Sequence, residues 1–407
     1  MTRIPQELVL LLFYKLWGYG GFLILAFLLR TDAFFSEGAG NEQTTAKVHA
    51  KNSITVVLDE NSSIPKNTTL LSGTSVLSHG EGNRNSHSGE LSGWHTRIHY
   101  VMGTLLEVRL PGDESSSLAL FSELFAISHQ HDQIFSTFLA ASPVSRFNRK
   151  SNHEPLVVPE ELIELANLAQ QLTAETQGAF DITVMPLVRL WKNARKNQLW
   201  PESESIVAAK RLAGAGGLDI NPESLTISKR VDGIELDFGG IAKGYCVDKM
   251  AECARQKGVK DAFINFGESS ILALGKDAHG NPWEVAVRNP EHPERLALKL
   301  KVCNMAIGSS AAYQNQSKIA GRIVGHIVDP RTGLPAPTEI AVTVVAPSAA
   351  LADALSTALV VLQPDQGMKI LEQFPDADAV IFHRTSKGNW QRDCSPGLRR
   401  YLNEVGF

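Results

Sequence analysis

The sequence lacks the patterns that mark several common functional classes. Its four cysteines form no C-x-x-C pair, which excludes a zinc knuckle and a thioredoxin-type redox site. It contains no G-x-x-x-x-G-K-[ST] segment, and no G-x-G-x-x-G opens a helix after a strand, so a P-loop ATPase and a Rossmann-type dinucleotide turn are excluded. The net charge of −4 offers no basic excess, and we therefore expect no nucleic-acid partner.

An almost unbroken apolar run covers residues 8–29, and only Lys15 and glycines interrupt it. The run is long enough to cross roughly 30 Å of hydrocarbon as a helix, but no clean small-residue cleavage site follows it. Arg3 precedes the run and Asp32 follows it, which favours a cytoplasmic N-terminus. We predict an uncleaved signal anchor at residues 1–30, with a cleaved signal peptide as the alternative. The rest of the chain would then lie on the periplasmic side of the inner (cytoplasmic) membrane.

Two further segments follow the apolar run. Residues 31–93 are rich in Ser, Asn, Thr, Gly and His, so we expect a disordered polar linker. Residues 94–407 alternate between helix and strand patterns and predict a single α+β (mixed α/β) domain with a sizeable core. The expected helices are 118–135, 159–177 and 350–362, and the expected strands are 97–110 (bent or paired about residue 103), 262–275, 283–287, 296–302, 323–328 and 340–345.

The stretch Ile234–Asp248 combines a strand pattern, a glycine turn and a helix pattern. Apolar and acidic residues alternate over its first five positions, which predicts a half-buried strand. Gly239 and Gly240 end the alternation, and Lys243 falls in the first turn of the helix that follows. Glycine N–H groups, a helix N-terminus and a lysine together suit a phosphate, although a tight connection gives the same pattern.

Two polar groups interrupt the apolar helix pattern of residues 350–362. Asp353 and Thr357 are four residues apart and share one helix face. A carboxylate and a hydroxyl on such a face are costly to bury unless a partner satisfies them, and Mg²⁺ takes hard oxygen ligands of this kind. An equally good interpretation is that Asp353 caps or hydrogen-bonds a neighbouring loop.

A dense polar turn at residues 329–333, D-P-R-T-G, follows His326. A single histidine is more often structural than catalytic. Beside such a turn, however, a titratable ring could meet a substrate as a base.

Seven short segments together resemble the ApbE family, the FAD:protein FMN transferases. Each segment is a weak signal alone, and their common order carries the resemblance. The segments are Met102-Gly103-Thr104, residues 136–148, Gly178-Ala179-Phe180-Asp181 with Pro186 and Trp191, residues 237–245 (D-F-G-G-I-A-K-G-Y) with Asp248, Asn265-Phe266-Gly267, residues 326–333 and residues 352–358.

The resemblance implies an FAD cleft and an Mg²⁺-dependent transfer of the FMN moiety of FAD to a threonine or serine hydroxyl, with release of AMP. It implies an acceptor that is a flavoprotein subunit of a membrane redox complex. His326 is by its position the candidate base, with Asp329 as a stabiliser or second candidate. The implied FAD contacts are Met102, Phe138 (at a position usually occupied by tyrosine), Ala179, Phe180, Asp181, Asp237, Lys243 and Ile327. The implied Mg²⁺ ligands are Asp353, Thr357, Ser356 and the main-chain carbonyl of Gly240.

The sequence departs from the family pattern at two places. The family usually has N-x-G-G-D, but here Glu268 and Ser269 follow Gly267. The family usually has T-S-G-x-Y, but here residues 309–313 read S-S-A-A-Y, with Ala311 at the glycine position. These departures bear on flavin affinity or acceptor preference. Two other functions stay open at this point: an FAD pyrophosphatase that gives AMP and FMN, and a flavin-binding protein without chemistry.

Overall fold

The structure is a computed structural model. It describes residues 34–36, 45–49, 53–57, 74–76, 93–151, 153–313 and 315–402. Within these ranges we find no helix whose length and apolar character would let it cross a membrane. The predicted signal anchor at residues 1–30 lies outside them, as does most of the predicted linker.

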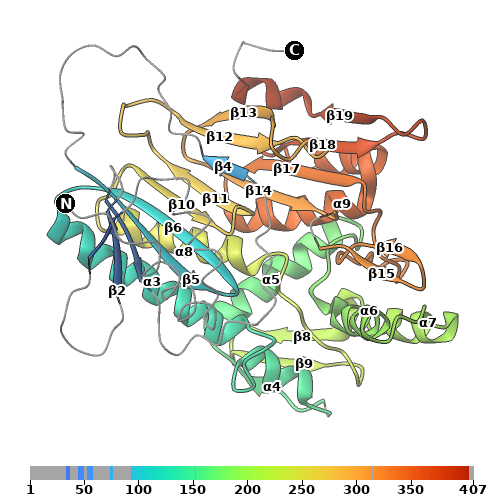
Figure 1. Cartoon of the computed structure of the whole chain (residues 1–407). Helices are drawn as coiled ribbons and strands as arrows, with labels where there is room; N and C mark the ends of the chain where they lie inside the picture. The colour runs from blue at the N-terminus through green and yellow to red at the C-terminus, as the bar shows by residue number, and fades with distance from the viewer. Residues whose placement is uncertain are drawn as a thin grey trace, which may run out of the picture.

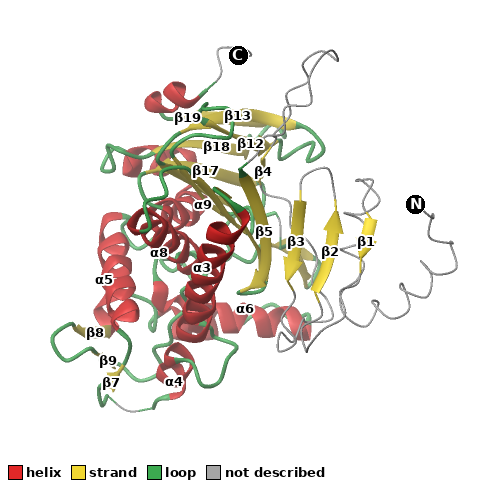
Figure 2. Ribbon diagram, turned by 90° about the vertical axis from the view of Figure 1, so that its left-hand side faces the viewer, coloured by secondary structure: helices red, strands yellow, loops and turns green. Residues whose placement is uncertain are grey.

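An 11-stranded sheet runs through the structure, and helices cover one of its faces (Figures 1 and 2). Neighbouring strands are antiparallel except for one parallel pair, the third and fourth strands of the order. The first three strands fall within the predicted linker. The order is β1 (Phe34–Ser36), β2 (Thr45–His49), β3 (Ser53–Val57), β5 (Trp94–Val101), β6 (Thr104–Pro111), β10 (Ala262–Phe266), β11 (Ser270–Leu274), β14 (Met305–Ala311), β17 (Ile340–Ala346), β18 (Asp378–Arg384) and β19 (Trp390–Cys394).

A smaller sheet covers the opposite face of β10 and β11. Phe263 and Ile271 of the large sheet pack there against Trp283 and Val285 in one apolar cluster. Alternate residues of the same strands, such as Ile264, face the helices instead. The small sheets are β13 (Leu296–Val302), β12 (Trp283–Arg288) and β4 (Thr74–Val76); β7 (Leu156–Val157), β9 (Thr226–Lys229) and β8 (Leu218–Asn221); and β15 (Ser317–Ile319) with β16 (Arg322–Val324).

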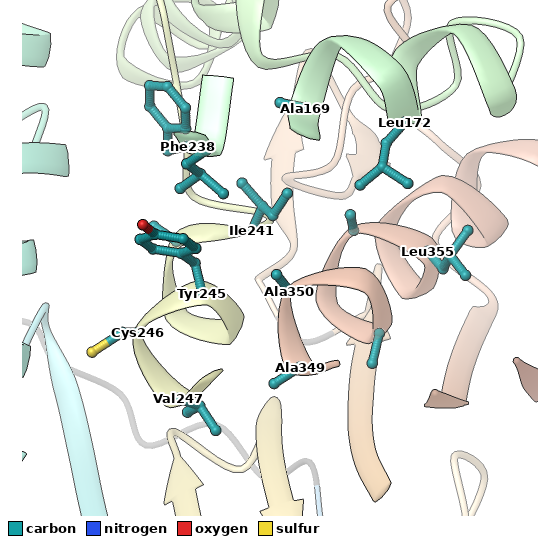
Figure 3. Packing of buried hydrophobic residues seen from close by; sticks show 14 of the residues in the cluster. Ala169, Leu172, Phe238, Ile241, Tyr245, Cys246, Val247, Ala349, Ala350 and Leu355 are labelled. Atoms are coloured by element: carbon teal, nitrogen blue, oxygen red, sulfur yellow. The ribbon is translucent and has the colours of Figure 1, made fainter. Parts of the chain in front are cut away.

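The helical layer contains most of the apolar core. Figure 3 shows Ile241, at the start of one helix, between Tyr245 of that helix and Ala350 of another, with Leu172 of a third close by. The helices are α3 (Glu114–Phe135), α4 (Pro143–Arg149), α5 (Glu160–Glu175), α6 (Met185–Asn197), α7 (Ser203–Lys210), α8 (Ala242–Gln256) and α9 (Ala349–Leu371), with 3-10 turns at Ile182–Val184, Ala215–Gly217 and Pro396–Tyr401.

Two glycines let α9 approach its neighbours unusually closely. A Cβ on Gly244 of α8 would lie 2.2 Å from the carbonyl oxygen of Ala349. A Cβ on Gly308 of β14 would lie 2.1 Å from the carbonyl oxygen of Ala352. Real Cβ atoms do not come this near to an oxygen, so glycine is required at both contacts. The first turns of α9 are therefore held between α8 and the sheet.

The predicted strand at residues 234–238 is wrong. Its residues alternate between buried and half-buried as expected, but the segment joins no sheet. Its backbone groups are satisfied elsewhere: the Leu236 N–H donates to Asn148 Oδ1 (2.7 Å), and the Asp237 N–H donates to the carbonyl of Ile182 (2.7 Å). Alternating apolar and polar residues indicate that one side of an extended chain is buried. They do not indicate which groups form hydrogen bonds with its backbone.

Most other predicted elements are confirmed, and one predicted strand is shorter than expected. Three expected helices correspond to α3, α5 and α9, and the strand pair about residue 103 is the β5–β6 hairpin. The expected strand 323–328 is only the three-residue β16, and the segment 136–148 of the family resemblance contains most of α4. His131 of α3 is buried, with 2% of its surface exposed.

Candidate functional site

The candidate site lies where the start of α8 meets the first turns of α9. Asp353 is 3% exposed, and its Oδ2 accepts the main-chain N–H of Gly244 at 3.2 Å. The Lys243 Nζ lies 4.0 Å from the same oxygen and donates to the carbonyl of Gly239 at 3.3 Å. A nearly buried carboxylate is thus balanced by one N–H and one ammonium group.

The hydroxyl of Thr357 lies one turn further along α9, beside the glycine loop. A Cβ on Gly240 would lie 3.2 Å from Thr357 Oγ1 and 3.3 Å from the ring of Phe180, so the loop runs against both side chains. Ser310 of β14 approaches from the sheet, and its Oγ lies 3.3 Å from Thr357 Oγ1. Residues more than a hundred positions apart therefore place oxygen atoms around one small region.

This donor set fits a hard divalent cation. Among the described residues no three His, Cys, Asp or Glu side chains gather in a way that could hold a metal. An ion bound here would rest on the Asp353 carboxylate with neutral oxygens from Thr357 and Gly240. Mg²⁺ accepts such sparse protein ligation because its remaining positions take waters or substrate phosphates.

Ser356, the other predicted metal ligand, is placed differently. Its side chain is fully buried, its Oγ donates to the carbonyl of Asp353 at 2.9 Å, and it shares a 2.8 Å hydrogen bond with Ser310 Oγ. Thr357 Oγ1 has the same two partners at 3.2 and 3.3 Å, and the difference is that Ser356 is fully buried whereas Thr357 is half-buried. The geometry gives Ser356 the role of fixing Ser310 beside Thr357.

Asp248 supports the site, although sequence reasoning gave it no role of its own. From α8 its two carboxylate oxygens accept the N–H groups of Ala349 (2.7 Å) and Ala350 (2.9 Å) at the start of α9. Burial raises the pKa of Asp248, while these hydrogen bonds oppose the increase. The carboxylate caps α9 from another helix and fixes Asp353 relative to Gly244. The sequence marked it only as part of the segment that carries the family resemblance.

The predicted FAD contacts around Asp181 come together with the glycine loop. Ala179 and Phe180 are buried, and Asp181 accepts the N–H and the hydroxyl of Thr183, both at 2.7 Å. Burial is the largest cause of the raised pKa of Asp181. Asp237 is half-buried, and its Oδ1 accepts the Gly239 N–H at 2.9 Å, which shapes the turn into α8. The two aspartates order the loops that border the site.

His326 combines exposure to water with a strongly shifted pKa. Its side chain is exposed, yet protein atoms surround it so closely that desolvation is the largest cause of a pKa lowered to about 4. The positive charges of Arg195 and Lys243 lower it further. At neutral pH the imidazole is uncharged and can accept a proton.

Asp329, the second candidate base, is already engaged. Arg331 donates to both of its oxygens, from Nε at 3.0 Å and from Nη2 at 3.1 Å. Trp191 Nε1 donates to the carbonyl of Gly333 at 2.9 Å and so ties the same turn to α6. This arrangement favours Asp329 as the residue that shapes the turn after His326, rather than as a base.

The remaining predicted contacts lie on other elements. Met102 forms the two-residue turn of the β5–β6 hairpin with φ of 50°, next to Gly103 at 77°. Phe138 is 88% exposed, and Lys192 of α6 lies 5.7 Å above its ring. Ile327 is half-buried, and its carbonyl accepts the Ala336 N–H at 2.9 Å. The described contacts join Phe138 to α6 and do not join it directly to Asp353.

The chain belongs to the ApbE family, whose sequence profile matches residues 102–382. It is 30% identical over 280 residues to an FAD:protein FMN transferase of Klebsiella pneumoniae, covering 67% of this chain and 80% of the relative. An FAD:protein FMN transferase of Haemophilus influenzae is 32% identical over 301 residues, covering 71% and 86%. These relatives identify the chain as a transferase.

Solved structures agree with the sequence comparison. The flavin transferase ApbE from Vibrio cholerae superposes with a TM-score of 0.68 at 27% identity, covering 76% of this chain and 99% of that structure. The apo form of the flavinyl transferase ApbE from Pseudomonas stutzeri gives 0.67 at 28% identity, covering 76% and 96%. The predicted mixed α+β ApbE-like fold is confirmed.

Proposed function

We propose that this protein transfers the FMN moiety of FAD to a threonine or serine hydroxyl of an acceptor protein, in an Mg²⁺-dependent reaction that releases AMP. The observation that carries the proposal is the meeting of the Asp353 carboxylate, the Thr357 hydroxyl and the Gly240 loop beside Lys243. Family membership supports it, because the curated relatives named above are FAD:protein FMN transferases.

The residues of the site divide the work on the pyrophosphate. Bound Mg²⁺ would neutralise charge on the phosphoryl oxygens, and Asp353, Thr357 and the Gly240 carbonyl would hold it. Lys243 supplies a further positive charge at the start of α8. Phe180 and the loops ordered by Asp181 and Asp237 would border the dinucleotide.

The reaction exchanges one phosphorus–oxygen bond for another. The acceptor hydroxyl oxygen attacks the phosphorus of the FMN half, and the bond from that phosphorus to the bridging oxygen breaks. The bridging oxygen leaves with AMP, and the hydroxyl proton passes to the neutral ring of His326. Bound phosphates offset the Arg195 and Lys243 charges, which makes the ring a stronger base in the complex than in the free protein.

We also propose where this chemistry takes place. The apolar run at residues 8–29 supports anchoring in the inner membrane, with residues 94–407 on the periplasmic side. The acceptor is then a flavoprotein subunit of a membrane redox complex on that side. A fusion of a periplasm-dependent reporter after residue 407, compared with one after residue 5, tests this orientation.

The experiment that tests the reaction uses the purified full-length chain with FAD, Mg²⁺ and an acceptor domain that carries a candidate threonine. Mass spectrometry is expected to show FMN on the acceptor, and the adduct is expected to vanish in Asp353→Asn and without Mg²⁺. AMP with free FMN and no adduct would identify a pyrophosphatase instead. Intact bound FAD under all conditions would identify a flavin-binding protein and contradict the proposal.

A further inference from the structure

A groove of about 410 Å³ lies next to the candidate site, and nothing in the proposed chemistry uses it. We call it the β16 groove. It runs between β16 and the extended chain that follows the Asp329 turn, and the end of α6 closes one side through Trp200. Its lining residues are Trp200, Arg322, Ile323, Val324, Leu334, Pro335, Ala336, Pro337, Thr338 and Glu339.

One wall of the β16 groove is a strand edge that pairs with no other strand in the described part of the chain. The β15–β16 hairpin closes through a two-residue turn, Ala320 at φ 47° and Gly321 at φ 83°, between Ile319 and Arg322. In such a hairpin the pair that flanks the turn exchanges hydrogen bonds, and the next pair does not. Ile323 belongs to that next pair, opposite Lys318. Its N–H and C=O therefore point away from β15 and can pair with another strand.

The side chains that line the β16 groove indicate what kind of peptide it can bind. Ile323 is 62% exposed and Leu334 42% exposed, so two large apolar side chains lie open to water at its rim. Of its two charged residues, Glu339 pairs with Arg384 at 2.6 Å. Arg322 stacks 4.7 Å over the Trp200 ring and forms no ion pair within the described part of the chain. The groove suits an extended peptide that has apolar side chains and an acidic residue.

The β16 groove lies close to the candidate base along the chain. Val324 lines it, and His326 follows two residues later at a bend in the chain, so the two Cα atoms are at most roughly 7 Å apart. Helix α6 borders both features, because Trp200 follows its end and its Arg195 lies close enough to His326 to act on the charge of the ring. A peptide that lies along β16 thus has one end directed at His326.

We propose that the β16 groove binds an extended segment of the acceptor protein as a third strand on β16 and so presents the acceptor hydroxyl to His326. Backbone pairing with Ile323 supplies affinity, the apolar rim takes alternate side chains, and Arg322 takes an acidic residue of the segment. This inference rests on the proposed transferase function and adds the surface by which it recognises its acceptor.

A peptide library tests the side-chain part of the proposal. The full chain with FAD and Mg²⁺ is incubated with short synthetic peptides that carry a central threonine and randomised flanks, and the flavinylated peptides are sequenced by mass spectrometry. We expect acidic residues to be enriched at one flanking position, and Arg322→Glu to replace them with basic residues. An unchanged flank preference in Arg322→Glu would overturn the proposal.

Two variants that replace an apolar residue by lysine measure how much the apolar rim of the groove contributes to peptide binding. Ile323→Lys should lower the adduct yield at subsaturating peptide by about tenfold, because the lost contact buries an apolar side chain, while FAD binding stays unchanged. The matched control is Val157→Lys, since Val157 is 69% exposed on β7, away from the groove. Equal yields in the two variants would contradict a docking role for Ile323.

Hydrogen exchange separates this inference from the proposed function. The Ile323 amide should exchange quickly in the free full-length chain and slowly with library peptides in which alanine replaces threonine, since these can dock but cannot react. Protection without any adduct from the threonine library would uphold the groove and contradict the transferase. Adducts without protection of the Ile323 amide would uphold the transferase and contradict the groove as the acceptor site. An Ile323 amide already protected in the free chain would mean that another segment of this chain occupies the groove, and would overturn the proposal.

Discussion

Lys243 and Asp353 form an ion pair of 4.0 Å between the first turn of α8 and the second turn of α9. The pair joins the two functions that the site needs, since the carboxylate suits a metal ion and the ammonium suits a phosphate. In the free protein each group balances the other. Binding of either ligand must therefore work against one existing charge interaction.

Removal of this ammonium should change two affinities in opposite directions. Lys243→Met should strengthen Mg²⁺ binding to the FAD-free protein and weaken FAD binding, each by about tenfold, because one like charge and one phosphate partner are lost together. Isothermal titration calorimetry measures both. Lys249→Met is the control, because this lysine lies on the same helix but pairs with Glu164. A parallel fall in both affinities would contradict the assignment.

The cap that Asp248 places on α9 should contribute to both stability and metal binding. Asp248→Ala leaves two buried N–H groups of α9 without a partner, and we expect a loss of about 1–3 kcal/mol in the free energy of unfolding. Asp248→Asn keeps one acceptor oxygen and should lose less. Urea unfolding measures stability, and Mg²⁺ titration should show weaker binding in the order Ala, Asn, wild type. Unchanged metal binding in Asp248→Ala would mean that Asp248 stabilises the start of α9 but does not position the metal ligands.

The contact between Gly244 and Ala349 should not tolerate even one methyl group. In Gly244→Ala the new Cβ meets the Ala349 carbonyl oxygen at 2.2 Å, so α8 and α9 must separate, at a cost of about 1–3 kcal/mol or more. The control is Gly216→Ala, where an added Cβ has nothing within 4 Å. Urea unfolding of the two variants gives the comparison, and equal stability would mean that the helices shift apart freely.

Some of this architecture could be read from the sequence because it depends on neighbouring residues. The apolar period of α9 placed Asp353 and Thr357 on one face, and the hairpin about Gly103 follows from its turn. The strand predicted at 234–238 failed because its backbone partners, Asn148 and Ile182, are distant in sequence. The Asp248 cap was hidden for the same reason. Local patterns give the elements, whereas contacts between distant elements decide which polar groups they satisfy.

Burial of His131 should make the fold sensitive to mild acid. Burial, aided by the charge of Lys249 and opposed by that of Glu164, lowers the pKa of His131 from 6.5 to about 4. The unfolded chain therefore binds a proton at higher pH than the folded chain does. The stability that this group contributes is complete above pH 6.5 and is lost as the pH falls to about 4, up to roughly 3 kcal/mol.

Replacement of this histidine by an aromatic ring without nitrogen tests that expectation. His131→Phe also removes the buried Nδ1 that has no hydrogen-bond partner among the described residues. Urea unfolding across this pH range should show a smaller loss of stability in the variant than in the wild type. Replacement of the exposed His279 by Gln is the control and should leave the wild-type pH dependence. Identical pH dependence in His131→Phe would mean that the folded protein accepts a charged His131.

The pKa of His326 should respond to the two cations that face it. NMR titration of its ring in the FAD-free protein should give a value of about 4, and Lys243→Met and Arg195→Met should each raise it. Because desolvation is the largest cause, the pKa should stay below 6.5 even in the double variant. Lys192→Met is the control, since this lysine of α6 lies over Phe138 and is not among the causes of the shift. A ring that titrates at its ordinary value in the wild type would contradict desolvation as the main cause of the lowered pKa.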